Sequence, residues 1–437
     1  MTFSTAISGI NAATSDLGVI SNNIANASTT GFKSSRAEFA DVYASSLLGA
    51  GSNAIGTGVS LASVTQEFGQ GNISFTNNSL DLAINGSGFF VLSAGGASEY
   101  TRAGTFQVDR EGFVVSAQNS RLQGFQVDSF GDVTGQVGDL QIDRSLIDPN
   151  QTGTAIFTTN LDSRETVPQP AGAFQTAANA GDGFDAFPAP PATPTTPAPE
   201  EFTDTSSTTI FDSLGNPHVL SIYYIKSGPN AYDVHALIDG QSQNLTGAAT
   251  ARVETLQFTS DGQFDPASPT SITISGWDPI DAIGEDNGAA TQDVTIDLAQ
   301  TTQFGANFAV SSIIQDGFSA GQLSGIEIDE NGVTFARYTN GESRALGQIA
   351  LANFNNLNGL QPIGDTNWVE TFSSGSPNVG EPGTAGLGAI QSAALEDSNV
   401  EITAALVDLI IAQRNFQANA QVIQANDAIT QTVINLR

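Results

Sequence analysis

Apolar residues recur at intervals of three and four positions near the N-terminus. This N-terminal stripe consists of Phe3, Ile7, Ile10, Leu17 and Ile24, with Thr14 and Ser21 in its two polar positions. Such spacing places side chains on one face of an α-helix and predicts an amphipathic helix. The stripe is narrow, and a short isolated helix is only marginally stable in water. The helix therefore needs a partner.

The C-terminal segment shows the same spacing with a wider apolar face. This C-terminal stripe consists of Ile402, Leu406, Leu409, Phe416, Ala420, Ile423 and Ile434, interrupted by Gln413, Asp427 and Thr430 and widened by Val407, Ile410 and Ile411. A wide stripe can contact two neighbours at once. Two interpretations stay open. The terminal helices pack within one molecule, or they form a coiled-coil assembly between molecules in which polar positions specify the register.

Between the two ends the pattern changes to a period of two residues with frequent turns. Residues 80–92 alternate around Asn85-Gly86, a typical β-hairpin signal, and similar units lie at 106–115, 218–225 and 326–338. Helical segments long enough for βαβ units are missing from this pattern. The middle of the chain is therefore predicted to be mainly β, with sandwich or barrel-like domains.

The pattern and the length of 437 residues suggest about three domains. We expect a terminal helical assembly domain at residues 1–70 and 386–437, a middle β domain at 71–155 and 318–385, and an outer β domain at 156–317. A proline-rich tract at 166–205 is expected to be a surface loop or linker, with a protein-binding polyproline motif as the alternative. The glycine-rich stretch at 373–388 is expected to be a hinge.

The charge of the chain excludes several classes of partner. It has 45 acidic and 13 basic residues, a formal net charge of −32, and no cysteine. Nucleic acid and anionic membrane surfaces both require clustered basic residues, so neither is an expected partner. No apolar run approaches the roughly 18 residues that would span a bilayer, so no membrane insertion is expected. The first residues lack the features of a Sec signal, which leaves another route if the chain is exported.

The search for catalytic or metal-binding residues yields only weak candidates. The sequence Gly317 to Gly321 matches G-x-S-x-G, but it continues into a strand-like pattern rather than a helix. The two histidines, His218 and His235, lie in strand-like surroundings. The acidic turns at 329–331 and 285–287 lack the spacing of a calcium loop and are expected to be solvated hairpin tips. No catalytic residue, cofactor or metal is therefore predicted.

The two amphipathic ends lack an obvious partner in the β body and are suited to assembly. A head-to-tail contact that does not close produces a filament or tube. Segments of this kind are expected to be largely unfolded in the monomer and to order on assembly. Within the N-terminal segment, Gly31 is expected to take a positive φ at the end of the helix, and Asn23 and Asn26 are expected to supply hydrogen bonds there.

Several motifs resemble the axial proteins of the bacterial flagellum, the rod and hook family. Residues 21–33 resemble the N-terminal signature of that family, and residues 395–400 and 412–419 resemble its C-terminal signature. Residues 80–90 and 100–104 resemble a segment that hook and rod members share. Within the family, residues 210–218 and 346–354 resemble the hook members, whereas distal rod members are shorter and lack this insertion.

The resemblance implies a structural subunit of the flagellar hook, a curved flexible tube that transmits torque from rod to filament. It implies export through the flagellar type III channel to an extracellular position in the hook and basal body. The implied partners are other copies of the chain, the distal rod protein, the hook cap, the hook-filament junction proteins and the export apparatus. By analogy, the terminal helices line the inner tube, a β domain forms the middle shell and the insertion faces outward.

The residues expected to carry assembly belong to the two stripes and to the matched motifs. On the N-terminal side they are the N-terminal stripe together with Asn23, Asn26, Thr29, Gly31, Phe32 and Lys33. On the C-terminal side they are Ile402, Leu406, Leu409, Ile410, Gln413, Arg414, Asn415, Phe416, Ala420 and Ile423. The alternatives are a distal rod protein, a secreted acidic adhesin or binding module with a stable monomer, and an enzyme without recognisable catalytic residues.

Overall fold

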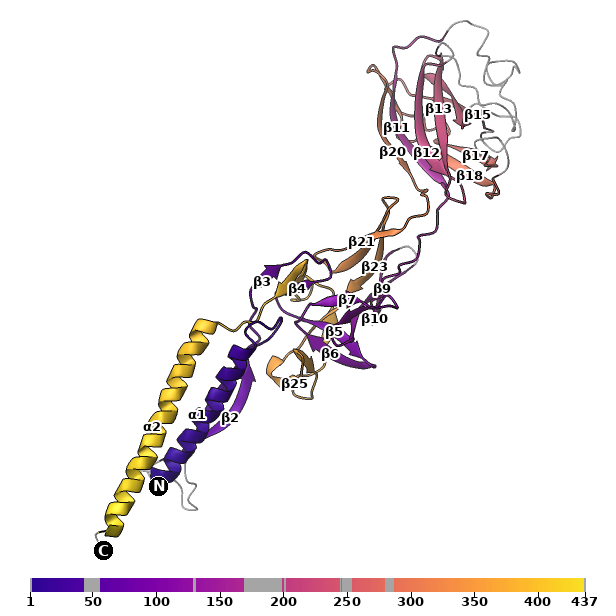
Figure 1. Ribbon diagram of the computed structural model, residues 1–437. Coiled ribbons are helices and arrows are strands. Elements are labelled where there is room, and N and C mark those ends of the chain that lie inside the picture. The colour runs from indigo at the N-terminus through magenta and orange to yellow at the C-terminus, as the bar shows by residue number, and fades with distance from the viewer. Residues whose placement is uncertain are drawn as a thin grey trace. The chain divides into compact units, whose positions relative to one another are not determined.

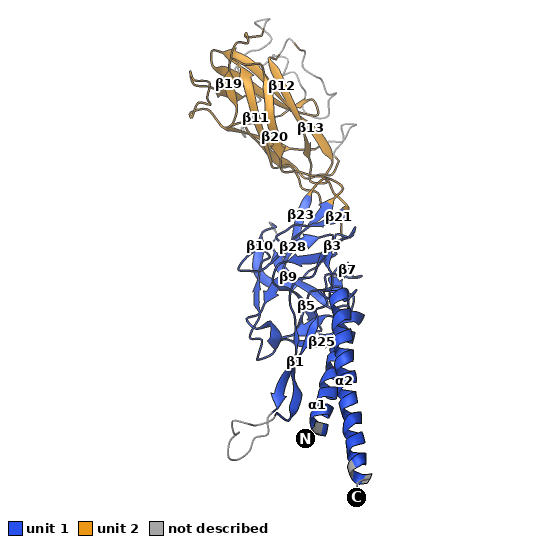
Figure 2. Ribbon diagram, turned by 90° about the vertical axis from the view of Figure 1, so that its left-hand side faces the viewer, with its two compact units in different colours: residues 1–144, 324–337, 343–437 blue, residues 145–323, 338–342 orange. Residues whose placement is uncertain are grey.

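The computed structural model describes residues 2–42, 56–128, 131–168, 199, 202–243, 245, 254–279 and 287–435. The chain divides into two compact units, shown in separate colours in Figure 2. Unit 1 comprises residues 1–144, 324–337 and 343–437, and unit 2 comprises residues 145–323 and 338–342. The predicted division into a helical, a middle and an outer domain stays a prediction. Most of the proline-rich tract at 166–205 lies outside the described residues.

Unit 1 contains the two long helices, α1 (Thr2–Ala25) and α2 (Ile402–Asn435). They lie side by side in Figures 1 and 2, with the N- and C-termini at the same end of the pair, so the helices are antiparallel. The rest of the described chain is almost entirely β, apart from one short 3₁₀ helix, η1 (Leu357–Gly359). The predicted fold class, a mainly β body with helices at both ends, is confirmed. Among the described residues, no helix is long and apolar enough to cross a membrane.

A two-stranded antiparallel hairpin lies beside α1, formed by β1 (Ser35–Val42) and β2 (Gly58–Gln66). A hairpin of two strands is at best marginally stable alone, and the helix supplies the surface on which it packs. At one end Asn23 of α1 and Ser35 exchange two hydrogen bonds, of 2.7 and 2.9 Å. Near the other end the Val59 amide donates to Ser8 Oγ at 3.2 Å. The hairpin therefore follows α1 along most of its length.

The β body of unit 1 is built on a 13-stranded sheet. Its main order is β21 (Leu323–Ile328), β22 (Val333–Tyr338), β23 (Ser343–Ile349), β9 (Arg121–Val127), β5 (Phe89–Ala94), β6 (Ala97–Thr101), β26 (Asn367–Val369) and β25 (Gln361–Gly364). The strands β7 (Phe106–Val108), β8 (Val114–Ser116), β10 (Val133–Asp139), β24 (Leu351–Asn353) and β27 (Asn378–Gly380) branch from it. Two small sheets pair β4 (Leu82–Asn85) with β28 (Ala389–Ser392) and β3 (Ile73–Phe75) with β29 (Ala394–Glu396).

Three of the predicted hairpins are confirmed, and one is wrong. The pairs β7–β8 and β21–β22 match the predictions at 106–115 and 326–338. The hairpin predicted around Asn85-Gly86 does not form, because β4 pairs with β28, whereas β5 pairs with β6, β9 and β24. Gly86 and Gly88 have φ values of 122° and 127°. These conformations redirect the chain between two different sheets instead of folding β5 back onto β4.

The glycine-rich stretch at 373–388 is an ordered part of unit 1, so the predicted hinge is wrong. It contains β27, which pairs with β24. Ser374 and Leu387 within it are 1% and 6% exposed. A segment that supplies a strand and buries side chains is fixed to the sheet it contacts. Its glycines serve turns, since Gly375, Gly383 and Gly386 all have positive φ.

Unit 2 consists of two five-stranded sheets that share one core, as a β-sandwich does. One sheet contains β17 (Ser271–Trp277), β18 (Gln292–Asp297), β11 (Thr154–Asp162), β19 (Thr302–Phe304) and β20 (Ala309–Gln315). The other contains β12 (Asp204–Phe211), β13 (Pro217–Gly228), β14 (Ala231–Ile238), β15 (Gln241–Ser242) and β16 (Glu254–Gln257). The pair β12–β13 confirms the hairpin predicted from 218–225. Phe157 and Tyr224, one from each sheet, are fully buried in this shared core.

Candidate assembly interface

A buried ionic cluster joins three distant segments of unit 1. Lys33 Nζ lies 2.7 Å from Glu396 Oε1, and Arg102 Nη1 lies 3.0 Å from Glu396 Oε2. The side chains of Lys33 and Glu396 are fully buried, and that of Arg102 is 5% exposed. Burial lowers the pKa of Lys33 and of Arg102, and the carboxylate of Glu396 opposes that shift. A single carboxylate therefore compensates two desolvated cations.

Backbone groups complete the surroundings of this cluster. Glu396 Oε1 also accepts from the Gly71 amide at 2.8 Å, and the Glu396 carbonyl accepts from the Gly31 amide at 2.8 Å. Lys33 Nζ donates to the Gly69 carbonyl at 2.7 Å, and Arg102 Nη2 donates to the Gly86 carbonyl at 2.8 Å. The cluster thus brings together the segments 21–33, 100–104 and 395–400, which the sequence had singled out separately.

Asn399 extends the same connection by pairing with the backbone on both sides. Its Oδ1 accepts from the Ser34 amide at 2.7 Å, and its Nδ2 donates to the Glu67 carbonyl at 2.7 Å. A side-chain amide that accepts and donates in this way substitutes for a strand neighbour. The chain entering α2 is therefore tied to the chain leaving α1.

Gly31 has the conformation that the sequence predicts. Its φ is 69°, and a Cβ built there would lie 2.4 Å from the Ala103 backbone nitrogen. Only glycine fits this close approach without displacing the backbone. The two asparagines also supply the expected hydrogen bonds. Asn23 bonds to the backbone of Ser35, and Asn26 Nδ2 donates to the Asn22 carbonyl at 3.0 Å while its Oδ1 accepts from Thr29 Oγ1 at 3.2 Å. Phe32 is half-buried beside them.

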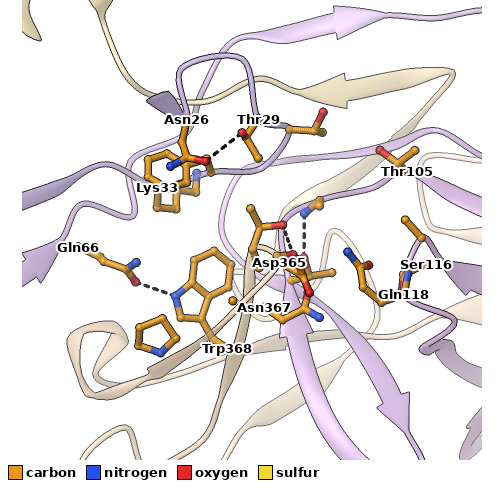
Figure 3. A pocket seen from close by; sticks show the side chains of 18 of the residues that line it. Asn26, Thr29, Lys33, Gln66, Thr105, Ser116, Gln118, Asp365, Asn367 and Trp368 are labelled. Carbon is orange, nitrogen blue, oxygen red and sulfur yellow. Dashed lines mark hydrogen bonds between the residues drawn. The ribbon is translucent and has the colours of Figure 1, made fainter. Parts of the chain in front are cut away.

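An open cleft of about 620 Å³ lies beside this cluster, between the end of α1 and the hairpin β25–β26. Figure 3 shows the indole of Trp368 donating to Gln66, and Thr29 hydrogen-bonded to Asn26. Asn367 and Gln118 also line the cleft. Its lining consists mostly of amides and hydroxyls, together with the Trp368 indole.

The contact between α1 and α2 uses small side chains that the sequence analysis did not select. On α1 the buried residues are Ala6, Ala13 and Ile20, at 4%, 7% and 8% exposure. On α2 the most buried residue is Ala412, at 1% exposure. A Cβ added to Gly9 would lie 2.6 Å from Asn419 Oδ1, so the helices approach closely there. The exact seven-residue spacing of 6, 13 and 20 was a usable signal, but alanine carries too little hydrophobicity to stand out.

The predicted N-terminal stripe lies on a neighbouring side of α1 and is only partly covered. Phe3 and Ile7 are 49% and 39% exposed, and Ile10, Leu17 and Ile24 are half-buried. Leu17 and Ile24 lie one turn after the buried Ala13 and Ile20, so this part of the stripe borders the buried side of α1, whereas Phe3 and Ile7 lie farther around the helix. Part of the stripe is therefore left exposed in the single chain, and its assembly role stays a prediction.

The C-terminal residues that were expected to carry assembly also divide into half-buried and exposed ones. Leu409, Ala420 and Ile423 are half-buried, on the side of α2 that contains Ala412. The residues that remain exposed are Ile402, Leu406, Ile410, Gln413, Arg414, Asn415 and Phe416. Val407 and Ile411, which widen the stripe, are 54% and 50% exposed. Most of the apolar surface of α2 is therefore uncovered in a single chain.

The weak catalytic and metal candidates gain no support from the geometry. The segment 317–321 makes strand-like bridges through Phe318 to Asn150 and through Gly321 to Ile147, then enters β21. The strand-to-helix turn that exposes a nucleophilic serine is absent from this described segment. Across the described part of the chain, no group of three His, Cys, Asp or Glu side chains is placed to hold a metal ion. Residues 285–286 of one acidic turn lie outside the described residues.

The two histidines are buried in unit 2. His218 is 5% exposed, and its Nδ1 lies 2.6 Å from Asp239 Oδ2. Desolvation lowers the pKa of His218, but the hydrogen bonds and charges of Asp239 and Asp212 outweigh it and raise the pKa overall. His235 is 3% exposed, and burial lowers its pKa to about 4. Both histidines lie in strands, His218 in β13 and His235 in β14, as the sequence pattern indicated.

Family models match four stretches of the chain. The flagellar basal body rod protein model matches residues 3–33, and the flagellar hook protein FlgE/F/G D1 domain model matches residues 83–158. The flagellar basal body protein FlaE D2 domain model matches residues 160–318, and the flagellar basal body rod FlgEFG protein C-terminal model matches residues 391–436. These matches define a flagellar axial protein.

Full-length relatives narrow the class to the hook. The chain is 35% identical to the flagellar hook protein FlgE of Escherichia coli over 444 residues, and 33% identical to that of Salmonella typhimurium over 443 residues, with 100% of each chain covered. The crystal structure of Helicobacter pylori flagellar hook protein FlgE2 matches with a TM-score of 0.52 and 15% identity, over 74% of this chain and 100% of that one. The chain belongs to the flagellar hook protein family, and it is a hook subunit. The distal rod and adhesin alternatives are not favoured.

Proposed function

We propose that copies of this chain assemble through the exposed apolar sides of α1 and α2 into the tube of the flagellar hook. The observation that supports this most directly is the position of the N-terminal stripe. Phe3 and Ile7 remain exposed although α1 already contacts α2 and the β1–β2 hairpin. Exposed apolar side chains arranged along a helix are typical of an interface with another chain.

The area left uncovered on α2 supports the same proposal. Ile402, Leu406, Val407, Ile410 and Ile411 are between 46% and 54% exposed within ten consecutive residues. Burying one such side chain contributes about 1.5–3 kcal/mol when it is fully removed from water. Burying the exposed half of several such side chains per copy therefore favours assembly.

The specific binding partners of the tube and the export route of the chain are inferred from the family rather than from the structure. We propose that the tube joins the distal rod protein at one end and the junction proteins and filament at the other, under a hook cap during growth. We propose that the chain reaches this position through the flagellar type III export apparatus. A chain with no cysteine is free of disulfides that would obstruct unfolded transit. A catalytic role is not part of the proposal.

A bending tube also requires contacts that can slide, and we assign these to the β units. Single surface ion pairs contribute only about 0–1 kcal/mol, so polar faces can exchange partners at low cost. The apolar helix contacts would hold the tube together while the β units change neighbours during each turn. This division of roles agrees with the acidic composition of the chain, because charged surfaces resist permanent association.

The proposal is tested by placing a charge in the N-terminal stripe. We expect Leu17→Asp to abolish pelletable tubes of the purified full-length chain, because a carboxylate is costly to bury at an interface. The matched control is Asn22→Asp, which adds the same charge at an exposed residue about 140° around α1 from Leu17 and should still form tubes. Normal tubes from Leu17→Asp would contradict the role of the stripe.

A second variant separates contacts within one chain from contacts between chains. Leu409 is half-buried on the side of α2 that contains Ala412. Leu409→Asp should therefore weaken both the packing of α1 on α2 and the assembly that depends on it. Ile410→Asp, at a side chain 49% exposed, should block assembly alone. Circular dichroism of the monomer checks that the β units of both variants remain folded.

A further inference from the structure

Arg414 is an exposed cation on α2. Among the described residues of the two helices it is the only basic side chain; the acidic ones are Asp16, Asp408 and Asp427. Arg414 is exposed and makes no ion pair within the described part of the chain. It follows Ile410 and Ile411 at spacings of four and three residues, so these exposed apolar side chains lie beside it.

This side of α2 faces away from α1. Ala412, which is buried against α1, is two residues from Arg414 and therefore about 160° away around the helix. A charged residue within an apolar helix surface is expensive to cover unless the covering surface carries the opposite charge. Whatever covers this side of α2 must therefore supply carboxylates.

The same chain has a hollow that meets this requirement. It has a volume of about 350 Å³ and lies between α1, the start of α2 and the start of β1. Its acidic residues are Asp16, Glu67, Glu401 and Asp408, its one basic residue is Arg36, and its apolar residues include Val19, Val400 and Ile411. Arg36 is already shared between Glu38 and Glu67, each at 3.5 Å.

Within the described part of the chain, Asp16 and Asp408 form no ion pair in this hollow. Burial raises the pKa of Asp16, and the neighbouring charge of Asp408 raises it further. The two carboxylates line the same hollow from opposite helices. A guanidinium inserted between them would relieve this repulsion, and its aliphatic stem would lie on the apolar lining.

The chain cannot satisfy this hollow with its own Arg414. Asp408 and Arg414 are six residues apart on one helix, which corresponds to about 9 Å along the axis and about 120° around it. Arg414 therefore points away from the hollow of its own chain. Among the described residues, the one cation that lines the hollow, Arg36, is already paired, whereas a second copy of this chain carries Arg414 amid apolar side chains of matching character.

We propose that the uncovered side of α2 in one copy docks on the α1–α2 pair of a second copy, with Arg414 inserted between Asp16 and Asp408 of that second copy. This inference rests on the proposed assembly function and adds the pairing that fixes the register of neighbouring helices. The apolar side chains around Arg414 supply most of the buried area, and the ion pair selects one axial position.

A charge exchange tests the pairing. Arg414→Asp should lower the yield of pelletable tubes about tenfold or more, because three carboxylates would then meet at the contact. Adding Asp408→Arg to that variant should restore the yield to within about threefold of the unsubstituted chain, since the opposite charges then meet again. The matched control pairs Arg414→Asp with Asp427→Arg. It has the same net charge and should stay as defective as the single variant.

Cross-linking tests the location independently of charge. The chain has no cysteine, so Asp408→Cys and Arg414→Cys each introduce a unique thiol. Tubes assembled from a mixture of the two single variants should give a cross-linked dimer with a short bis-maleimide, whereas the unassembled mixture should not. A mixture of Asp427→Cys with Arg414→Cys is the matched control and should remain uncross-linked in tubes.

The outcomes separate the pairing from the assembly on which it rests. Wild-type tubes together with normal tubes from Arg414→Asp would overturn the pairing alone. The pairing is also overturned if Asp408→Arg restores the tube yield of Arg414→Asp no better than Asp427→Arg does. It is likewise overturned if the two cysteine mixtures cross-link to the same extent in tubes. If the unsubstituted chain forms no tubes, the proposed function and this inference fall together.

Discussion

The Lys33 amine and the Glu396 carboxylate, 363 positions apart in the chain, lie 2.7 Å from each other in the interior of unit 1. Arg102 reaches the other oxygen of the same carboxylate at 3.0 Å. The pair ties the segment leaving α1 to the segment entering α2. Both helices are therefore anchored to the β body at one point.

Removing the shared carboxylate should destabilise unit 1 strongly. Glu396→Gln leaves two buried cations without a counter-ion, and breaking a buried pair in this way costs about 3–5 kcal/mol. Urea unfolding of the full-length chain measures the change. Glu327→Gln is the control, since its ion pair with Arg337 has both side chains more than half exposed and should change stability by less than about 1 kcal/mol. Equal effects of the two substitutions would contradict a special role for the buried cluster.

Replacing either of two glycines in the N-terminal segment by alanine should change stability, with opposite signs at the two positions. Gly31→Ala forces a side chain into a left-handed conformation and against the Ala103 backbone, so we expect a loss of more than about 1 kcal/mol. Gly18→Ala, in the middle of α1, meets nothing within 4 Å and should stabilise the helix by about 0.8–1 kcal/mol. Thermal unfolding of assembled tubes reports both changes. A stable Gly31→Ala tube would contradict the close approach to Ala103.

The stability of unit 2 should depend on pH through Asp204. Burial, and then the charges of Glu165 and Asp162, raise the pKa of Asp204 from 3.8 to about 6. The folded state therefore holds this proton up to about pH 6, whereas the unfolded state releases it near pH 3.8. It follows that the contribution of Asp204 to stability is greatest below pH 3.8, falls as the pH rises to about 6, and stays constant above.

Asp204→Asn removes this dependence. The thermal midpoint of the variant minus that of the unsubstituted chain should rise between pH 4 and pH 6 and then level off, because only the unsubstituted chain must ionise a desolvated carboxyl group. Asp261→Asn, at an exposed turn residue, serves as the control and should give no such rise. A difference that stays the same from pH 4 to pH 8 would show that Asp204 is already ionised in the folded chain.

Assembly should strengthen with added salt over the low range. Copies with a net charge of −32 repel each other at close packing. Screening shortens the Debye length from about 30 Å at 0.01 M to about 10 Å at 0.1 M. The same screening weakens the single pairing of Arg414, but one attractive contact is outweighed by the net charge of the whole chain. Pelletable tube yield that falls over this range would count against charge repulsion as the dominant electrostatic effect.

Local pattern was sufficient to predict the two terminal helices, the β character of the middle and the left-handed conformation of Gly31. Helical and strand periodicity depend on neighbours within a few residues, and a glycine at the end of a helix is a local signal. The motifs around Lys33, Arg102 and Glu396 were also visible in the sequence as separate segments. Nothing local indicated that they meet, because a buried ion pair depends on the path of the intervening chain.

The tertiary structure decided which side of each helix is used, and which strands pair. The N-terminal stripe is the most hydrophobic side of α1, yet the small side chains of Ala6 and Ala13 are buried whereas Phe3 and Ile7 stay exposed. Close approach of two helix backbones favours small residues, as at Gly9 and Asn419, so hydrophobicity alone does not identify the most buried positions. Likewise, β4 pairs with β28, about 300 residues away, instead of with β5. Such pairings are set by competition among all strands of the fold, which no local pattern contains.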